Sequence, residues 1–393
     1  MRTRKESMES KNCREPRLRL PGFEGEWVEK TLGESFDERS EKNRSDLPLL
    51  SLGENGLVYQ SETARKDNSS ADKSKYLRVA VGDIAYNTMR MWQGRCVHAD
   101  IEGIVSPAYT VCKPREGVDS LLHYYLFRTQ RMIQLFHQNS QGLVSDTLNL
   151  KYDSFSKIKY LIPPSLAEQE KIAHCLSEAD NMITAQEHKV ESLKAHKKGL
   201  IQQLFPQAGT TTPSLRFPGF IGEWQEKPFD SLCHTITPPL KLQSSQYLSS
   251  GKYPVIDQSQ SLICGWTNDV NGLVNNIPSI IFGDHTCVLK FIDFPFVQGA
   301  DGVKILSPIV GNDPRFVYQL LLSSPVKQDG YKRHFSDLKE KTFCLPPTHD
   351  EQNKLAECLF SLDQVISAEE KELEALKVHK KGLMQQLFPQ FEK

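Results

Sequence analysis

The sequence predicts a mixed α+β protein: two α/β domains joined by two long helices that pair as an antiparallel coiled coil. Three observations support this prediction. A stretch of 45 residues with helical periodicity occurs twice, a shorter motif opens each half of the chain, and dissimilar stretches lie between the repeats. At 393 residues the chain is long enough for two domains that each bury a core.

The long repeat spans residues 163–207 and returns at 346–390, at a constant offset of 183 with 26 of the 45 positions identical. Proline pairs open both copies, and Pro206 and Pro389 end them, so each copy is bounded as a helix. A hydroxyl followed three residues later by a glutamate predicts a capping box at each start: Ser165 with Glu168, and Thr348 with Glu351.

Within each copy, one stripe of positions recurs at alternating steps of four and three, which is the heptad spacing of a coiled-coil seam. In the first copy these positions are Ile172, Leu176, Ala179, Ile183, Gln186, Val190, Leu193, Lys197, Leu200 and Leu204. In the second they are Leu355, Leu359, Leu362, Ile366, Glu369, Leu373, Leu376, Lys380, Leu383 and Leu387. The polar interruptions fall at the same two places, which favours mutual pairing over a helical face on a globular core. Entry of the helices from different domains predicts antiparallel pairing and an approximate two-fold axis.

The short motif LRLPGFEGEWVEK at 18–30 returns as LRFPGFIGEWQEK at 215–227, at an offset of 197. Trp27 and Trp224 recur in this frame, so we expect them to be structural. The repeats divide the chain into the following segments: a disordered basic tail at 1–17, a first domain at 18–162, a central helix at 163–207, a second domain at 208–345 and a distal helix at 346–393.

Strands and single helices alternate in both intervening segments, which favours mixed α/β domains. In the first segment we expect strands at 81–87 and 103–114, a helix at 120–138, and a short strand before Pro163. In the second we expect a strand and loop at 278–286, two further strands, a helix at 314–324, and a short strand before Pro346.

Composition gives no sign of nucleic-acid binding. The net charge is −1, and residues 31–162 hold 17 basic and 16 acidic side chains, while residues 228–345 hold 10 of each. A nucleic-acid reader usually has a basic face, so this balance counts against DNA binding. Nine cysteines without a CxxC pattern indicate reduced thiols in a cytoplasmic protein, and no apolar run is long enough for a membrane span.

Candidate base readers are polar side chains on exposed loops, because arginine recognises guanine and amides recognise adenine. In the first domain they follow the strand at 81–87, where a plain surface loop with a buried tryptophan is an equal alternative. The candidates there are Asn87, Arg90, Trp92, Gln93 and Arg95. In the second domain a tight turn at GDH is the alternative, and the candidates are Gln258, Gln260, His285, Thr286, Lys290, Lys332 and Arg333. We expect the last two to contact phosphates.

Catalytic motifs are missing from the sequence. Its Pro-Pro pairs do not form the loop with which adenine methyltransferases hold a flipped base, and no GxxxxGK[ST], HExxH or GxSxG occurs. Glu369-Glu370-Lys371 resembles a nuclease E-x-K, but it lies on the predicted coiled coil and is better explained as a solvated charge run. We therefore expect no catalytic residue, no metal site and no enzymatic activity.

The PGFxGEWxEK openings, the repeats ending in KKGLxQQLFPQ, and the GDI and FGDHT segments together resemble the specificity subunits of type I restriction-modification systems. The resemblance covers the chain from about residue 17 onward. It implies a non-catalytic DNA-binding subunit whose two recognition domains each read one half of a split sequence. It also implies that the helices set the spacing and dock two modification subunits, and that restriction subunits join the complex. S-adenosylmethionine, ATP and magnesium are then expected on the partner subunits, and this chain needs no cofactor.

A duplicated coiled-coil scaffold that joins protein partners without touching bases is the alternative. The neutral charge favours the scaffold. The repeated helices and short motifs are nearly constant, whereas the segments between them differ. This favours a specificity subunit, because the surfaces that recognise different sequences diverge while the surfaces that serve assembly do not.

Overall fold

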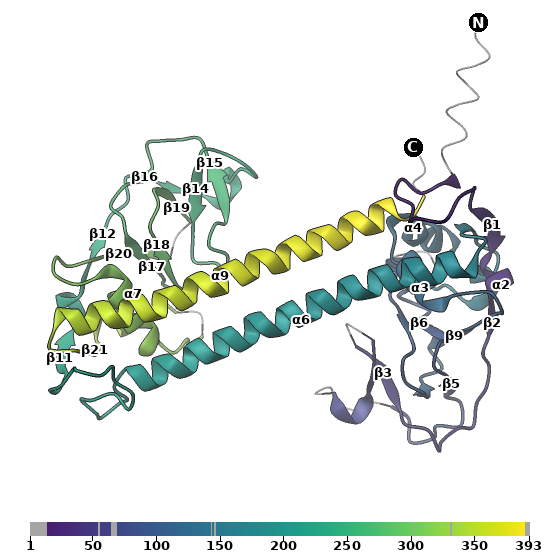
Figure 1. Cartoon of the computed structure of the whole chain (residues 1–393), viewed down its shortest axis with the longest axis horizontal. Coiled ribbons are helices and arrows are strands. Elements are labelled where there is room, and N and C mark those ends of the chain that lie inside the picture. The colour runs from purple at the N-terminus through teal and green to yellow at the C-terminus, as the bar shows by residue number, and fades with distance from the viewer. Residues whose placement is uncertain are drawn as a thin grey trace, which may run out of the picture. The chain divides into compact units, whose positions relative to one another are not determined.

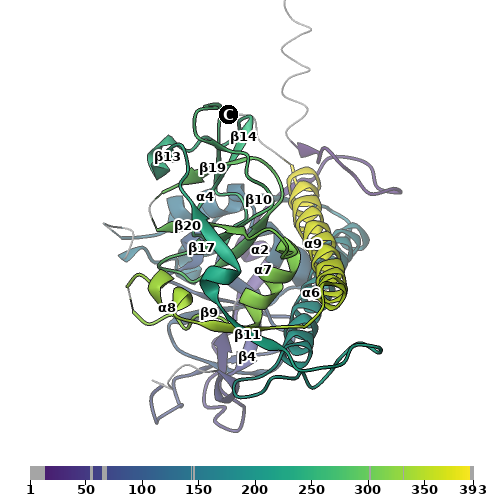
Figure 2. The same cartoon turned by 90° about the vertical axis from the view of Figure 1, so that its left-hand side faces the viewer.

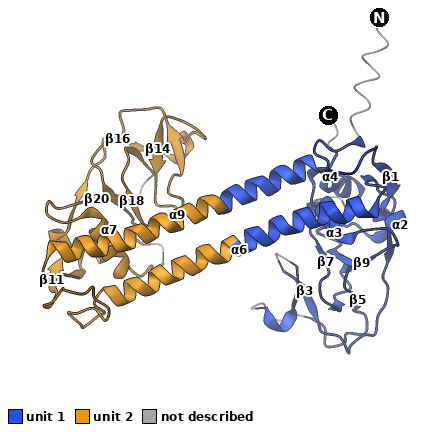
Figure 3. Ribbon diagram, in the orientation of Figure 1, with its two compact units in different colours: residues 1–185, 373–393 blue, residues 186–372 orange. Residues whose placement is uncertain are grey.

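The computed structural model describes residues 14–53, 56–63, 69–142, 144, 147–300, 302–330 and 332–389. The chain forms two compact units, residues 1–185 with 373–393 and residues 186–372 (Figure 3). Each unit contains one strand-rich domain and part of each long helix. Most of the predicted basic tail, residues 1–13, lies outside the described residues. Its last part is not free: the carbonyl oxygen of Arg14 accepts a hydrogen bond of 3.0 Å from the backbone N–H of Trp27.

Unit 1 is built on a four-stranded antiparallel sheet in the order β2-β9-β6-β7, of which Figure 1 labels β2, β9 and β6. Its strands are β2 (Phe36–Glu38), β9 (Tyr109–Pro114), β6 (Ile84–Asn87) and β7 (Cys96–His98). Three strand pairs surround it: β1 (Val28–Thr31) with β10 (Lys159–Ile162), β3 (Leu50–Leu52) with β4 (Leu57–Tyr59), and β5 (Leu77–Val79) with β8 (Gly103–Val105). The helices are α2 (Leu32–Ser35), α3 (Ser120–Leu126), α4 (Gln130–Asn139) and α5 (Tyr152–Phe155). Aromatic side chains fill its core, among them Phe36, Phe127, Phe136 and Phe155.

Unit 2 repeats this plan with the antiparallel sheet β12-β20-β17-β18. The strands are β12 (Cys233–Ile236), β20 (Val303–Pro308), β17 (Ser279–Gly283) and β18 (Leu289–Ile292). The pair β11 (Gln225–Pro228) with β21 (Thr342–Leu345) corresponds to β1 with β10. A second, mixed sheet contains β13 (Lys241–Leu242), β19 (Phe296–Gly299), β14 (Tyr253–Ile256), β15 (Gly265–Thr267) and β16 (Leu273–Val274). The helices are α7 (Pro314–Ser323) and α8 (Phe335–Lys339).

The mixed α+β prediction is confirmed, with two local corrections. The single helix expected at 120–138 is two helices, because the chain turns at 127–129 and the Thr129 side chain accepts a hydrogen bond from the backbone N–H of Met132 to cap α4. The strand expected at 103–114 is interrupted at Ser106-Pro107-Ala108, and its two parts join different strand pairs, β8 with β5 and β9 with β6. Helical periodicity and apolar runs do not reveal such breaks.

The long repeats form α6 (Leu166–Leu204) and α9 (His349–Gln386). In each unit a part of α6 lies beside a part of α9, as both views show (Figures 1 and 2). None of the predicted seam positions is exposed. In unit 2 the amide of Gln186 donates to the carboxylate of Glu369 at 2.6 Å, while Lys197 pairs with Asp363, eleven residues further along α6 and six earlier on α9. The two helices are therefore antiparallel, as predicted.

Each lysine in the seam forms an ion pair with an aspartate of the other helix, and the two pairs occupy equivalent positions of the repeat. Lys197 contacts Asp363 at 2.6 Å in unit 2. In unit 1 the equivalent residues, 183 positions away in each case, form the ion pair Lys380–Asp180. The Lys197 side chain is only 10% exposed, so removing its partner would leave a nearly buried charge. These pairs fix the register of the helices, since a shift along the seam would separate lysine from aspartate.

The capping-box prediction is confirmed at Thr348 in one of its two hydrogen bonds: the Thr348 hydroxyl accepts a hydrogen bond of 3.3 Å from the backbone N–H of Glu351. The carboxylate of Glu351 accepts two hydrogen bonds, of 2.7 and 2.8 Å, from Arg216 of the short motif. Glu168 accepts two from Arg19, at 3.0 and 2.9 Å. Both carboxylates are 2% exposed, so a buried bidentate ion pair holds the short motif to the start of a long helix in each unit.

The short motif also contacts the end of a long helix. In unit 2 the Trp224 ring meets Phe205 edge-on at 5.9 Å, just after the last residue of α6. In unit 1 the Trp27 ring meets Phe388 at 6.1 Å, just after α9. Both tryptophans are buried, which agrees with the structural role expected for them. Each short motif therefore ties the beginning of one long helix to the end of the other.

Replacing Arg216 with methionine should lower the free energy of unfolding by about 3 kcal/mol, because it leaves the Glu351 carboxylate buried without its partner. Arg19→Met should have a similar effect through Glu168. Urea unfolding of the full chain measures both. Lys159→Met is the control, because its ion pair with Glu29 is largely exposed and should contribute less than about 1 kcal/mol. Equal stability of all three variants would contradict this account of the frame.

Candidate nucleic-acid interface

The loop after β6 in unit 1 is a fixed turn rather than a free loop. The Asn87 carbonyl oxygen Oδ1 accepts a hydrogen bond of 2.9 Å from the backbone N–H of Met89. The Trp92 indole donates to the carbonyl oxygen of Met89 at 3.0 Å, and its ring meets His137 of α4 at 5.9 Å. These two candidates therefore shape the loop. Arg90 and Arg95 are exposed and Gln93 is half-buried, so the arginines are the candidates that the loop presents to solvent.

Four candidates of unit 2 lie together although they come from three segments. The Gln258 side chain accepts a hydrogen bond of 3.1 Å from the backbone N–H of His285, and the Thr286 hydroxyl donates to the carbonyl oxygen of Gln258 at 2.8 Å. The His285 Nδ1 atom lies 3.1 Å from the carbonyl oxygen of Lys332. Lys332 and Arg333 are exposed, and Lys332 lies 3.3 Å from Asp337. The structure thus gathers one polar cluster from loops that are distant in sequence.

Lys290 requires a correction, because its side chain is buried and cannot serve as a surface contact. It is 5% exposed, and its ammonium group donates to the carbonyl oxygens of Asp257 and Ser261 at 2.7 and 2.6 Å. Burial lowers the pKa of this ammonium, while Asp257 opposes the shift. Lys290 therefore holds the loop that carries Gln258 and the exposed Gln260, and its role is to position them.

The GD dipeptides of both halves are structural, which agrees with the tight turn considered for the second domain and was not expected for the first. Asp83 is 1% exposed and accepts two hydrogen bonds from Arg39, at 2.6 and 3.0 Å, and one from the backbone N–H of Ala80. Asp284 is 2% exposed, and its carboxylate accepts a hydrogen bond of 2.8 Å from the backbone N–H of Phe335. Each aspartate thus anchors a segment beside the sheet of its own unit. A glycine followed by an aspartate at the end of a predicted strand was the sequence pattern that could have indicated this structural role.

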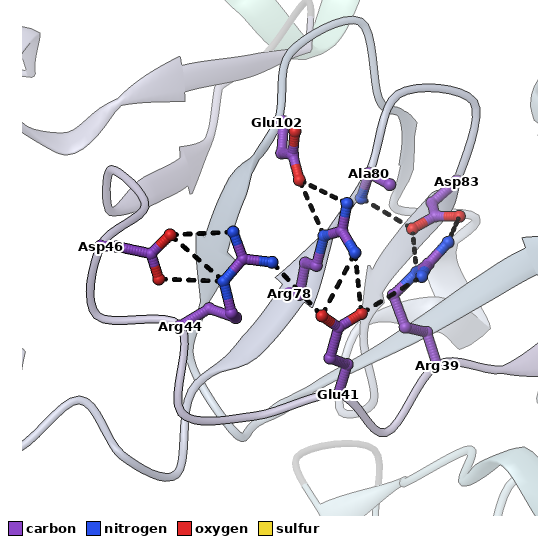
Figure 4. Close-up of polar contacts among 8 residues, drawn as sticks. All are labelled: Arg39, Glu41, Arg44, Asp46, Arg78, Ala80, Asp83 and Glu102. Carbon is purple, nitrogen blue, oxygen red and sulfur yellow. Dashed lines mark hydrogen bonds and ion pairs between the residues drawn. The ribbon is translucent and has the colours of Figure 1, made fainter.

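Asp83 belongs to a larger ion-pair network in unit 1 (Figure 4). Glu41 accepts from Arg78 at 2.9 Å and lies 3.6 Å from Arg39 and 3.3 Å from Arg44. Arg78 also donates to Glu102, and Arg44 to Asp46. The hydrogen bond to Arg78 is the main reason why the pKa of Glu41 is lowered. Three arginines and four carboxylates of this domain are therefore paired with one another. The near-neutral total charge of the domain does not show where its unpaired charges lie.

No group of three or more potential metal ligands occurs in the part of the chain that the structure describes. Nor does any helix among those residues combine the length and apolar character needed to cross a membrane. What the structure presents is a pair of different domains on a duplicated helical frame, each with polar and cationic side chains on loops beside an antiparallel sheet. Polar and cationic loops on such domains are typical of a recognition protein.

Residues 25–195 and 221–378 match the family model described as the type I restriction modification DNA specificity domain, and the chain belongs to this family. Members of this class give type I restriction-modification enzymes their DNA sequence specificity and are not themselves catalytic. The resemblance seen in the sequence is thereby confirmed.

Two curated relatives are similar to this chain in sequence, and two solved structures share its fold. The chain is 24% identical over 363 residues to the type I restriction enzyme MjaVIII specificity subunit of Methanocaldococcus jannaschii, which covers 79% of this chain and 81% of the relative. It is 26% identical over 122 residues to the EcoR124I/EcoR124II specificity subunit of Escherichia coli, covering 29% and 30%. The S subunit structure from M. genitalium matches 96% of this chain and 100% of its own at a TM-score of 0.63 and 16% identity. A structure described for complex assembly and conformational transition of the type I R-M system matches 95% and 99% at 0.51 and 15%.

Lys290→Met should loosen the loop at 257–261, because two carbonyl oxygens lose their donor at a cost of about 1–3 kcal/mol. We expect faster hydrogen exchange at the backbone amide of Ser259, which donates to the Asp257 side chain at 2.8 Å. Hydrogen exchange followed by mass spectrometry measures this. The exposed Lys327→Met is the control and should leave the exchange unchanged. Unaltered exchange in the Lys290 variant would contradict the positioning role.

Proposed function

We propose that this chain is a double-stranded DNA-binding subunit whose two domains each read one half of a bipartite target. The observation that supports this most is the duplicated frame. The buried ion pairs Arg19–Glu168 and Arg216–Glu351 occupy equivalent positions, as do the Trp27–Phe388 and Trp224–Phe205 contacts. The domains inside this frame differ in sequence, and unit 2 has a second sheet of its own. Two different domains held by equivalent contacts are what recognition of a split DNA sequence requires.

The long helices then act as spacer and as docking surface for two modification subunits, and restriction subunits join the same complex. Their outward faces support this role, since most residues of α6 and α9 away from the seam are exposed. Methyl transfer and cleavage take place on the partners, which hold S-adenosylmethionine, ATP and magnesium. This chain carries no catalytic residue in the proposal and requires no cofactor.

A protein scaffold that never contacts bases is the competing function, and the near-neutral composition is the observation in its favour. The ion-pair network of unit 1 weakens the argument from composition. The acidic side chains in the network are paired with arginines of the same domain, so they are not free to repel DNA. We therefore prefer the DNA-reading function.

Exchanging residues 228–345 for the same segment of a relative should change one half of the methylated sequence and leave the other half intact. The physical reason is that the core of unit 2 closes without side chains from unit 1. Methylome sequencing of cells that carry the chimera with its partner subunits measures both halves at once. Alteration of both halves would contradict independent reading, and a chimera with both halves unchanged would contradict base reading by this domain.

Matching four-residue insertions after Ala185 and Ala368 should lengthen the nonspecific spacer by one or two base pairs. Four residues add about 6 Å and about one turn to each helix, while base pairs advance by about 3.4 Å. Both helices must change, because an insertion in one alone creates a local stutter that the pair can absorb.

Sequencing of methylated sites measures the spacer, and the single insertion after Ala185 is the control. Both half-sites should persist in the double variant. An active double variant with the original spacer would show that the length of the helices does not set the distance between the half-sites.

A further inference from the structure

A surface cleft of about 630 Å³ lies in unit 1 beside the loop that follows β6. Segments 38–42, 75–77, 107–110 and 149–153 contribute to its lining, and Thr88 and Met89 complete the lining where the loop begins. Because these segments are far apart in sequence, no local motif could have indicated the cleft. A molecule seated there would lie next to the loop that presents Arg90 and Arg95.

Three exposed lysines give the cleft its charge: Lys42, Lys75 and Lys151. None of them forms an ion pair within the described residues, in contrast to the arginines of the network in Figure 4. Lysine ammonium groups on long side chains suit phosphates as adaptable point charges. The two acidic residues of the lining are Glu38 and Asp153. Burial raises the pKa of Glu38, and Asp153 adds to the shift while Lys42 opposes it.

One wall of the cleft is held rigid by the ion-pair network. Arg39 lines the cleft, but its guanidinium is fixed to Asp83 by two hydrogen bonds, of 2.6 and 3.0 Å. Glu41, next to Lys42, is held by Arg78 at 2.9 Å. The backbone that carries Lys42 is therefore positioned before any ligand arrives, which reduces the ordering cost of binding.

We propose that this cleft is a phosphate-binding site for the DNA backbone, contacted by the ammonium groups of Lys42, Lys75 and Lys151. The proposal rests on the DNA-reading function and names the surface through which unit 1 docks on the duplex. Phosphate contacts fix register and orientation without selecting sequence. The cleft thus positions DNA, and the adjoining loop with Arg90 and Arg95 is placed to meet base edges.

The test uses the triple variant Lys42→Gln, Lys75→Gln, Lys151→Gln in the full chain, assembled with its modification subunits. Binding to a duplex that contains the methylated site is measured across a range of KCl concentrations. Each phosphate contact contributes about 0.9 to the slope of log K against log salt, so the slope should fall in magnitude by about 2.7. The methylated sequence should stay the same. The control is Arg17→Gln, Lys113→Gln, Lys157→Gln, which removes the same charge from exposed residues of unit 1 outside both the cleft lining and the long helices.

Each outcome decides the proposal. A smaller slope in the cleft variant but not in the control supports it. Equal slopes in the wild type, variant and control would overturn it, as would an altered methylated sequence with an unchanged slope, which would make the cleft a base reader. Failure of the variant to assemble with the modification subunits would assign the cleft to a protein partner instead. If the wild-type complex itself shows no site-specific binding, the proposed function fails, and not only the assignment of this cleft.

Discussion

A buried bidentate ion pair, formed once in each unit, is the interaction on which the rest of the structure depends. Glu168 and Glu351 lie in the first turns of the long helices and are 2% exposed, so each requires its arginine. Those arginines belong to the short motifs, whose tryptophans pack against the other helix at its end. Three separated stretches of sequence are thereby joined at one place in each unit. The strands that follow the short motif, β1 and β11, then start at a defined position.

The polar residues of the seam are a second case in which a buried charge requires one particular partner. Apolar side chains alone would stabilise several registers of two such similar helices, whereas a lysine that is nearly buried tolerates only the register that supplies an aspartate. Lys197–Asp363 and Lys380–Asp180 satisfy this requirement at equivalent positions. Between them Gln186 meets Glu369, its own equivalent in the repeat. The helices therefore pair with each other through contacts that the duplication itself supplies.

The frame could be predicted from the sequence, because its signals are local and repeated. Heptad spacing identified seam positions such as Leu176 and Leu359, both fully buried, and the prolines bounded both helices. The capping pattern did not reveal that Glu168 and Glu351 bind distant arginines, because no local pattern shows such partners. The sites were less predictable for the same reason. Lys290 looks like a surface lysine in sequence, yet its ammonium is enclosed by a loop from about thirty residues earlier. Counting charges did not show which of them are paired, because the partners of Arg39 and Arg78 lie about forty residues away in the sequence.

The central claim is that two different domains on one frame read two different half-sites. The most direct measurement is sequencing of the sites methylated in a host that expresses this chain with its modification subunits. The account predicts one asymmetric, bipartite sequence, with two unlike specific half-sites separated by a nonspecific spacer of constant length, and loss of that methylation when this chain is omitted. A single contiguous site, two identical half-sites, or methylation that persists without this chain would contradict it.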